Sequence, residues 1–587
     1  MLGKIVEIVD NQVFIDLAID INNQTNLINL HTVFEDGDKK VVGSIANVNK
    51  QKMTINILGE FVNGEFMPGS STKPSFKSIV RLIKMDELQK ILGSQTATKN
   101  ETFFGYSSIY QNYKINVSIN EFFSNHFAIL GNSGSGKSCT VASIIQKLFT
   151  STPEPPLKSK IFLFDAYGEY TDAFKDLSKH NQNIIYKTYT TNTKYAETDI
   201  IRIPLWLMDV DDLALLLDVT SPNQLPIIEK ALKLVPILTG ESSETIKNKN
   251  DIIARALEDI LLSGANSTKI RDQVIAVLTK FNTSELNLET QIVQPGYVRT
   301  LKQCLYIDKS GKFQEIELVT EFIRSFIKDK TEDTNIKRDD IKYTLEDLEQ
   351  AMEFALISEG ILKSERVYDD ANVLSVRLHA LANSEAKEYF SYPEYIKKED
   401  FIYSLLRDNM SGMTAQIVNF NINYVDDRMA KVITKILSRL IFSMAVNNQN
   451  RGSEAYHIII EEAHRYVQKD KDIEILGYNI FERITKEGRK YGVFLGLITQ
   501  RPSELSDTAI SQCSNFVILR TLHPKDLGYI RDMVPNISQE IVAQLKNLRP
   551  GNCIAFGSAF KVPISMYVEL PNPRPNSNNV DLQSVWY

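Results

Sequence analysis

The sequence predicts an α/β fold whose central sheet is mostly parallel, and two short segments carry that prediction. Residues 127–130 form an apolar run that is followed at once by a glycine-rich loop and a helical pattern. Residues 458–460 are three apolar, β-branched isoleucines that follow His457, and two carboxylates, Glu461 and Glu462, come directly after them. Short apolar runs of this kind are typical of strands buried on both faces, as in parallel sheets covered by helices. A turn-rich part precedes these segments, and a helical part separates them.

The amino-terminal part, residues 1–95, is predicted to form a small domain of short strands. Residues 4–9 and 53–58 are rich in β-branched side chains. Asn63-Gly64 is a pair that favours a tight hairpin turn. These strands lack interleaved basic and aromatic side chains, which argues against a freestanding nucleic-acid-binding barrel.

The loop after residues 127–130 has the spacing of a phosphate-binding loop. Its glycines let successive backbone N–H groups point inward at phosphate oxygens. Lys137 would reach the β- and γ-phosphates, the Ser138 hydroxyl would hold Mg2+, and the following helix directs its positive end at the same anion. The alternative is an ordinary strand-to-helix turn rich in glycine and serine. The predicted ATP-binding residues are Gly131, Asn132, Ser133, Gly134, Ser135, Gly136, Lys137, Ser138 and Cys139.

The acidic pair after residues 457–460 indicates the class of reaction. Open α/β sheets place their chemistry at the carboxyl edge of the strands. Glu461 would occupy the outer shell of Mg2+, and Glu462 would orient or deprotonate the attacking water. The alternative is a solvated acidic pair at a strand end, and the phosphate-binding loop in the same chain argues against it. Together the two segments predict hydrolysis of a nucleoside triphosphate.

Composition adds limits on compartment and partners. The chain has 587 residues, enough for three or four domain-sized pieces. Its four cysteines lack metal-type spacing, which predicts reduced thiols and a cytoplasmic protein. We expect no leader and no membrane anchor, because no segment reaches about 18 consecutive apolar residues. The net charge of −7 does not exclude DNA, since only a pore lining needs positive charge.

Helical periodicity dominates residues 186–405, which we expect to be a helical insertion. Trp206, near its start, is predicted to anchor the insertion on the core, because a buried aromatic is more often core than ligand platform. Residues 406–570 then return to the pattern of alternating strands and helices. Residues 571–587 form a tail rich in proline and asparagine, which predicts an extended segment.

A series of motifs in a fixed order gives the chain a family resemblance. The motifs are residues 126–138, Asp165-Ala166-Tyr167-Gly168-Glu169-Tyr170, Glu461-Glu462-Ala463-His464, Glu487-Gly488-Arg489-Lys490-Tyr491-Gly492, Thr499-Gln500-Arg501-Pro502-Ser503 and residues 551–557. The chain resembles the HerA/FtsK branch of the RecA-like translocating ATPases, most closely the HerA-type hexameric DNA translocases. The resemblance implies a RecA-like P-loop ATPase core in residues 96–185 and 406–570, an N-terminal small β-barrel and an inserted helical domain.

The resemblance also implies roles for further residues. Gln500 matches the sensor position, whose amide hydrogen-bonds the γ-phosphate or the attacking water. Arg489 matches the position from which a neighbouring subunit inserts an arginine finger, with Arg483 as its rival. Asp165 or Glu169 resembles an acidic site near the metal or the subunit contact. For each of these side chains, an ordinary solvated polar role is the alternative. The acidic pair is Glu-Glu where many relatives have Asp-Glu, which leaves the metal geometry open.

The implied partners follow from the same resemblance. HerA-type motors form homohexamers, move along double-stranded DNA without sequence specificity, and work with a separate nuclease or NAD-consuming effector protein in DNA-end processing or anti-phage defence. Lys469 and Lys471 are candidates for phosphate contact from a pore loop, or for a solvated loop. The rival function is an ATP-gated ring scaffold that assembles an effector enzyme with little translocation. A membrane-associated secretion or conjugation ATPase of the same superfamily is disfavoured because no anchor is predicted.

Overall fold

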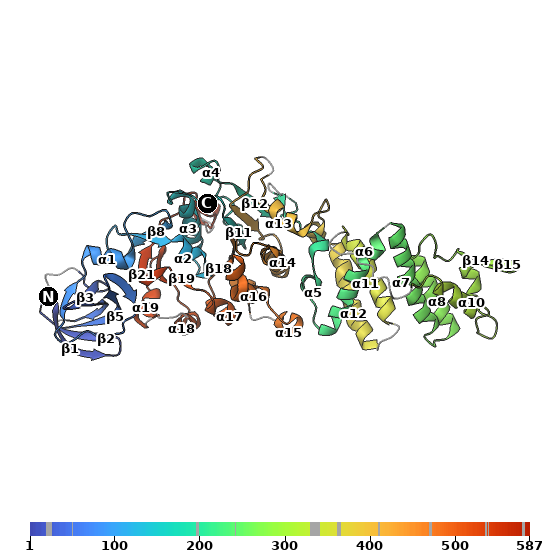
Figure 1. The fold of residues 1–587 in the computed structure, drawn as a ribbon, viewed down its shortest axis with the longest axis horizontal. Coiled ribbons are helices and arrows are strands. Elements are labelled where there is room, and N and C mark those ends of the chain that lie inside the picture. The colour runs from blue at the N-terminus through green and yellow to red at the C-terminus, as the bar shows by residue number, and fades with distance from the viewer. Residues whose placement is uncertain are drawn as a thin grey trace.

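The described chain forms an elongated molecule of three parts (Figure 1). An amino-terminal sheet lies at one end, a large mixed sheet with its helices forms the middle, and a set of helices extends to the other end. Within the ranges given next, no helix is both long and apolar enough to cross a membrane. The computed structural model describes residues 1–18, 26–49, 51–194, 199–240, 242–328, 341–360, 365–408, 411–468, 472–533, 537, 539–577 and 582–586.

The amino-terminal sheet consists of β1 (Gly3–Val9), β2 (Gln12–Leu17), β3 (His31–Asp36), β4 (Lys39–Val48), β5 (Lys52–Val62), β6 (Glu65–Pro68) and β7 (Ile79–Leu82). Its order is β1-β2-β5-β4-β3-β7, with β6 paired to β5, and all pairs are antiparallel. The N–H of Leu2 donates to the carbonyl of Val80 at 2.7 Å, which brings β1 beside β7. Val13, Ile15 and Ile55 are fully buried in a separate core of this sheet.

The large sheet consists of β8 (Glu101–Ser107), β9 (Lys114–Ser118), β10 (Phe127–Leu130), β11 (Lys160–Asp165), β12 (Tyr186–Thr190), β13 (Asp199–Ile200), β16 (Ile417–Asn421), β17 (Tyr456–Ile460), β18 (Val493–Thr499), β19 (Asn515–Leu519), β20 (Asn552–Gly557) and β21 (Phe560–Tyr567). The order is β13-β12-β16-β11-β17-β18-β10-β19-β20-β21-β8-β9. Neighbours from β13 to β19 are parallel, and the remaining strands continue the sheet in antiparallel fashion. The predicted α/β fold with a mostly parallel sheet is therefore confirmed.

Strand β12 shifts one predicted boundary. The sequence predicts that the helical insertion begins at residue 186, but Tyr186–Thr190 pairs in parallel with β16 and belongs to the large sheet. β13 continues the same edge to Ile200. The first three residues of β12 are only half-buried, so this strand near the sheet edge has no continuous apolar run that would signal it.

Helices cover both faces of the parallel strands, and side chains of β10 alternate between them. Phe127 and Ile129 pack in one core with α3 (Lys137–Thr150), whereas Ala128 and Leu130 pack in the other with α14 (Asp427–Asn447). The other helices of this part and its flanks are α1 (Met85–Leu92), α2 (Ile119–Phe123), α4 (Leu177–His180), α15 (Asp472–Leu476), α16 (Ile480–Glu487), α17 (Asp507–Ser511), α18 (Pro524–Met533), α19 (Gln539–Leu545) and α20 (Leu582–Trp586).

The helices between β13 and β16 form the extended end of the molecule (Figure 1). Trp206 at their start is 1% exposed, and its Nε1–H donates to the carbonyl of Ile396 at 2.8 Å. The contacts of its ring with Ile396, Tyr392 and Tyr395 all lie within residues 186–405, so anchoring on the core stays a prediction. The elements are α5 (Val210–Leu216), α6 (Leu225–Thr239), α7 (Ser243–Leu261), α8 (Ser267–Lys280), β14 (Gln291–Gln294), β15 (Tyr297–Thr300), α9 (Leu301–Cys304), α10 (Ile316–Arg324), α11 (Leu345–Gly360), α12 (Glu365–Ala382) and α13 (Lys398–Leu406).

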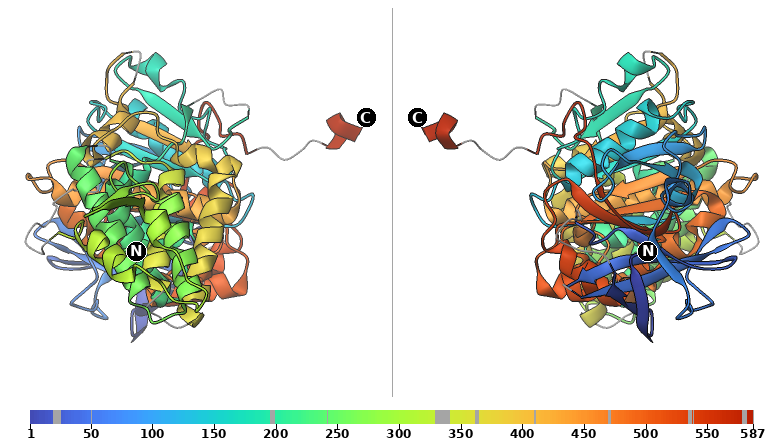
Figure 2. Two further views of the ribbon diagram at one scale, coloured as in Figure 1. Left: turned by 90° about the vertical axis from the view of Figure 1, so that its right-hand side faces the viewer. Right: turned by 90° about the vertical axis from the view of Figure 1, so that its left-hand side faces the viewer.

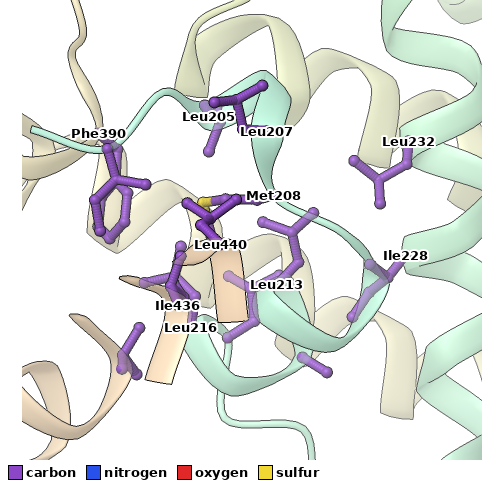
Figure 3. Packing of buried hydrophobic residues seen from close by; sticks show 14 of the residues in the cluster. Leu205, Leu207, Met208, Leu213, Leu216, Ile228, Leu232, Phe390, Ile436 and Leu440 are labelled. Carbon is purple, nitrogen blue, oxygen red and sulfur yellow. The ribbon is translucent and has the colours of Figure 1, made fainter. Parts of the chain in front are cut away.

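Helix α5 ties these helices to α14 through apolar and ionic contacts. Figure 3 shows Leu216 of α5 next to Ile436 and Leu440 of α14. Arg439, on the same helix α14, donates from Nε to Asp212 Oδ1 at 2.8 Å, and both side chains are buried. An ion pair in such an apolar setting is costly to break, because removal of one partner leaves the other charge without compensation.

The tail lies along its own chain before it leaves the body. The N–H of Asn572 donates to Gln146 Oε1 of α3 at 2.9 Å, and the N–H of Asn576 donates to the carbonyl of Glu169 at 2.8 Å. Helix α20 stands apart from the body in both views of Figure 2. Residues 571–577 have no helix or strand and bend at 572, 573 and 576, and they contact the helix that follows the phosphate-binding loop.

Candidate nucleotide-binding site

The phosphate-binding loop has the backbone conformation that its glycines allow. Gly136 has φ +95°, a left-handed conformation, and caps α3 directly before Lys137. A Cβ on Gly131 would lie 2.8 Å from Leu519 Cβ, closer than atoms of two side chains can pack. The loop therefore needs glycine at both positions, one for the turn and one for the close approach of β19.

Lys137 lies among carboxylates. Burial lowers the pKa of its ammonium group, and Glu462, Glu461 and Glu169 act in the opposite direction. The Nζ atom lies 3.4 Å from the carbonyl of Asn132 within the loop. The structure thus brings together the lysine, both members of the acidic pair and one of the two further acidic candidates.

Asp165 and Glu169 have different surroundings, which separates the two candidates. Asp165 is fully buried and accepts hydrogen bonds from the N–H groups of Glu169 at 3.0 Å and Tyr170 at 2.8 Å. It therefore orders the loop after β11. Burial raises the pKa of Glu169, while the Ser138 hydroxyl lowers it. Glu169 thus lies near Ser138, the predicted Mg2+ ligand, and its role there stays a prediction.

Glu461 follows the last residue of β17 and is buried. Its Oε2 accepts the N–H of Ala166 at 3.2 Å. Burial raises the pKa of Glu461 well above its usual range, and the nearby Asp165 and Glu169 raise it further. A cation beside this cluster would offset the repulsion, because opposite charge favours the ionised form.

Glu462 adopts an uncommon backbone conformation, with φ +47°, and its side chain is buried. Its Oε2 lies 3.2 Å from Nδ1 of His464, which in turn lies 2.9 Å from Oγ1 of Thr499. The sequence analysis did not assign a role to His464, although it forms part of the Glu-Glu-Ala-His motif. Thr499 is the last residue of β18, so this contact joins two strand ends.

Gln500 stands next to the start of the phosphate-binding loop. Thr499 pairs with Leu130 in the parallel ladder, and its carbonyl accepts the N–H of Gly131 at 3.2 Å. Gln500 follows directly and is half-buried. Because β18 lies between β17 and β10, Gln500 comes from the strand that separates the acidic pair from the loop.

Arg489 is not brought to this edge of the sheet. Its Nη1 donates to Asn125 Oδ1 at 2.9 Å, and Asn125 precedes the amino end of β10, whereas the phosphate-binding loop follows the carboxyl end. Arg483 lies 3.6 Å from Glu487 and 5.6 Å from the ring of Phe442. The sequence did not predict a role for Asn125, because no motif links it to Arg489, which lies far along the chain.

The residues present fit ATP and Mg2+. Ser135 Oγ is buried and has no hydrogen-bond partner in the described chain, so it has an unused donor within the loop. Burial raises the pKa of the Cys139 thiol, which keeps negative charge away from the phosphates. Among the described residues, no group of three or more His, Cys, Asp or Glu side chains could hold a metal alone. Mg2+ beside a nucleotide keeps several waters and takes substrate phosphates as ligands.

Comparisons with known proteins agree with this geometry. The family model for "Helicase HerA, central domain" matches residues 103–303, which include the phosphate-binding loop. The chain is 26% identical over 521 residues to "Probable helicase MJECL08" of Methanocaldococcus jannaschii, covering 88% of this chain and 79% of that protein. It is 23% identical over 521 residues to "DNA double-strand break repair helicase HerA" of Pyrococcus furiosus, covering 87% and 76%. This chain is similar to HerA-type helicases over most of its length.

The resemblance to HerA drawn from the motifs is thereby confirmed, and with it the assignment to the P-loop ATP hydrolases. Among solved structures, the coupling protein TrwBdeltaN70 has a TM-score of 0.42 and 12% identity, covering 84% of this chain and 94% of that one. VirB4 of Thermoanaerobacter pseudethanolicus has a TM-score of 0.40 and 12% identity, covering 81% and 98%. Lys469 and Lys471, the pore-loop candidates, lie outside the described residues.

Proposed function

We propose that this chain is an ATP-dependent, Mg2+-dependent motor that acts on duplex DNA without sequence specificity and works as a homohexamer. The observation that carries the proposal is the division of the site between two edges of the large sheet. Lys137, Glu461 and Glu462 gather at the carboxyl edge, whereas Arg489 is held at the amino edge. A head-to-tail ring joins the two edges, because each subunit then offers one edge to the other edge of its neighbour.

In the proposed reaction each residue of the carboxyl edge has one task. Backbone N–H groups of the loop bind the phosphates, and Lys137 balances charge on the β- and γ-phosphates. Ser138 would hold Mg2+ directly and Glu461 through water, and the ion when bound neutralises charge on the phosphate oxygens. Glu462 takes the proton of the attacking water, and Gln500 orients that water or the γ-phosphate.

Arg489 completes the site of the neighbouring subunit in this proposal. Its guanidinium stays charged and spreads its donors over the phosphate oxygens as charge develops. The hydrogen bond from Arg489 to Asn125 supports a fixed position for this side chain. Arg483 is the weaker candidate, because Glu487 and Phe442 of its own chain already engage it.

The other parts of the chain would serve assembly and partners. We infer that residues 1–95 form the small β-barrel that ties neighbouring subunits together or docks a partner, and the contact of Leu2 with Val80 supports closure of its sheet. The helices between β13 and β16 would be the inserted domain. In the cytoplasm the ring would work with a separate nuclease or NAD-consuming effector, in DNA-end processing or anti-phage defence. The name of the Pyrococcus furiosus relative supports DNA as the substrate.

The test is the ATPase rate of the purified protein with and without long duplex DNA, with particle mass measured alongside. Lys137→Ala and Glu462→Gln serve as blanks. We expect strong stimulation by DNA that falls as salt rises, because phosphate contacts are ionic. Normal DNA-stimulated turnover in either variant, purified as a folded ring, would contradict the assigned roles. An ATPase rate that requires Glu462 but is not stimulated by DNA would instead favour the ATP-gated scaffold.

A further inference from the structure

A polar bridge spans the ends of two adjacent strands beside the candidate nucleotide site. His464 Nδ1 lies 3.2 Å from Glu462 Oε2 and 2.9 Å from Thr499 Oγ1. Glu462 and His464 follow β17, and Thr499 ends β18. All three side chains are buried, with Thr499 fully excluded from solvent. Burial makes such contacts decisive for side-chain position, because water cannot replace them.

The chemistry of the three groups favours one tautomer of His464. Glu462 Oε2 contacts Nδ1 at 3.2 Å without hydrogen-bond geometry in this structure, and that contact is favourable when Nδ1 carries a proton, because a carboxylate only accepts hydrogen bonds. Thr499 Oγ1 already accepts the N–H of Arg501 at 3.0 Å and has a second lone pair for Nδ1–H. The Nδ1–H tautomer of His464 therefore suits both neighbours, and the alternative tautomer would face the carboxylate with a lone pair.

Glu462 needs such a support. Its φ of +47° lies in a region that non-glycine residues rarely adopt, and such conformations persist where the surroundings enforce them. On the other side, Thr499 is bonded through its carbonyl to the N–H of Gly131 and directly precedes Gln500. The bridge thus links the acidic pair, the sensor strand and the start of the phosphate-binding loop.

We propose that His464 is a positioning residue that fixes the carboxylate of Glu462 relative to the sensor strand, so that the base and Gln500 act on one water molecule. The inference rests on the proposed function, in which Glu462 takes the proton. In this proposal His464 acts only through Glu462 and not on the nucleotide. Its loss should therefore impair turnover while nucleotide binding persists, because a misplaced base costs rate and leaves the phosphate contacts intact.

The test compares His464→Asn with His464→Leu, two side chains of similar size and shape. The asparagine amide can place an N–H near the position of Nδ1, and leucine cannot. We expect His464→Leu to lower kcat by about tenfold to hundredfold, with KM and the Kd for ADP changed by less than about twofold. His464→Asn should retain most of the wild-type kcat. Equal kcat values in the two variants would overturn the proposal, as would a parallel loss of ADP binding.

Two Thr499 variants and one control variant test the bridge independently of His464. Thr499→Val removes the second partner of His464 and should lower kcat in the same way, with no added loss when combined with His464→Leu. Thr499→Ser should behave as wild type, and a fall equal to that of valine would count against the bridge. His457→Leu is the matched control, because His457 is a buried histidine on β17 that contacts the carbonyl of Phe123. It should lower stability and leave kcat unchanged. If His464→Leu does not fold, the Thr499 pair decides.

The background of Glu462→Gln separates failure of this inference from failure of the proposed function. Full turnover in Glu462→Gln alone would refute the assignment of the base, whatever His464 does. If Glu462→Gln is inactive and His464→Leu keeps its kcat within twofold of wild type, only the positioning role is refuted. If both fall, adding His464→Leu to Glu462→Gln should cause no further loss, because the two act as one unit.

Discussion

Substitution of Arg489 by alanine tests the division of the site between subunits. Asn125 holds Arg489 at the amino end of β10, and the phosphate-binding loop begins at Gly131 beyond the carboxyl end. Six residue steps of extended chain separate Asn125 from Gly131, or about 20 Å. Arg489 therefore cannot serve the nucleotide of its own chain while Asn125 holds it. In the proposed ring, its effect on hydrolysis therefore comes through the neighbouring subunit.

The expected magnitude follows from this geometry. An arginine finger contributes about 10³ to 10⁵ in turnover, so Arg489→Ala alone should be nearly inactive. Glu462→Gln should also be nearly inactive. In rings assembled from equal amounts of the two, about a quarter of the subunit contacts pair an intact Glu462 with an intact Arg489 of the neighbour. Mixed rings should therefore recover up to about a quarter of the wild-type ATPase rate if contacts act independently.

The assay is DNA-stimulated ATP hydrolysis by differently tagged, co-expressed subunits, purified through both tags. Rings of each variant alone give the baseline. Arg483→Ala is the matched control, because Arg483 lies on the neighbouring turn of the chain and already contacts Glu487. It should retain most activity. Absence of recovery in mixed rings at every ratio, or near-normal turnover of Arg489→Ala alone, would refute the reasoning.

Three further outcomes follow from buried groups. Arg439→Met should lower the free energy of unfolding by about 3–5 kcal/mol in urea titrations, because Asp212 loses its partner; a loss under about 1 kcal/mol would contradict the ion pair. Gly136→Ala should abolish ATP binding in calorimetry, since φ +95° disfavours alanine, and unchanged affinity would contradict the loop geometry. Burial lowers the pKa of His126 and His457 from 6.5 to about 4, so these side chains become protonated at a lower pH in the folded state than in the unfolded state. Each contributes about 3 kcal/mol of stability above pH 6.5 that is lost as pH falls towards 4. Thermal melts should show this fall, and a flat Tm between pH 7 and pH 4 would contradict it.

Local sequence patterns predicted the elements that carry chemistry, because each signal lies within one segment. The loop before Lys137 and the acidic pair of Glu461 and Glu462 follow buried strands, and the structure places them at one sheet edge as the parallel pattern requires. Strand β12 was missed because its burial is partial and its sequence carries no apolar run. Its neighbours in the sheet, and not its own composition, make it a strand.

Contacts between distant segments explain what local patterns could not supply. Arg489 meets Asn125 across a separation of 364 residues, and Arg439 meets Asp212 across 227. No periodicity or motif spacing encodes such pairs. The different surroundings of Asp165 and Glu169 likewise depend on loop conformation, because the backbone N–H groups after β11 donate hydrogen bonds to Asp165. His464 lay within a predicted motif, but only the register of β17 against β18 showed its second partner.

Movement along duplex DNA is the central claim, and displacement of a third strand tests it most directly. A triplex-forming oligonucleotide is placed at a fixed distance from the end of a long duplex, and its release is followed after ATP is added. The account predicts release that requires ATP and Mg2+, is delayed as the distance increases, and is absent in Glu462→Gln. ATP hydrolysis stimulated by the same duplex, with no release at any distance, would contradict a motor.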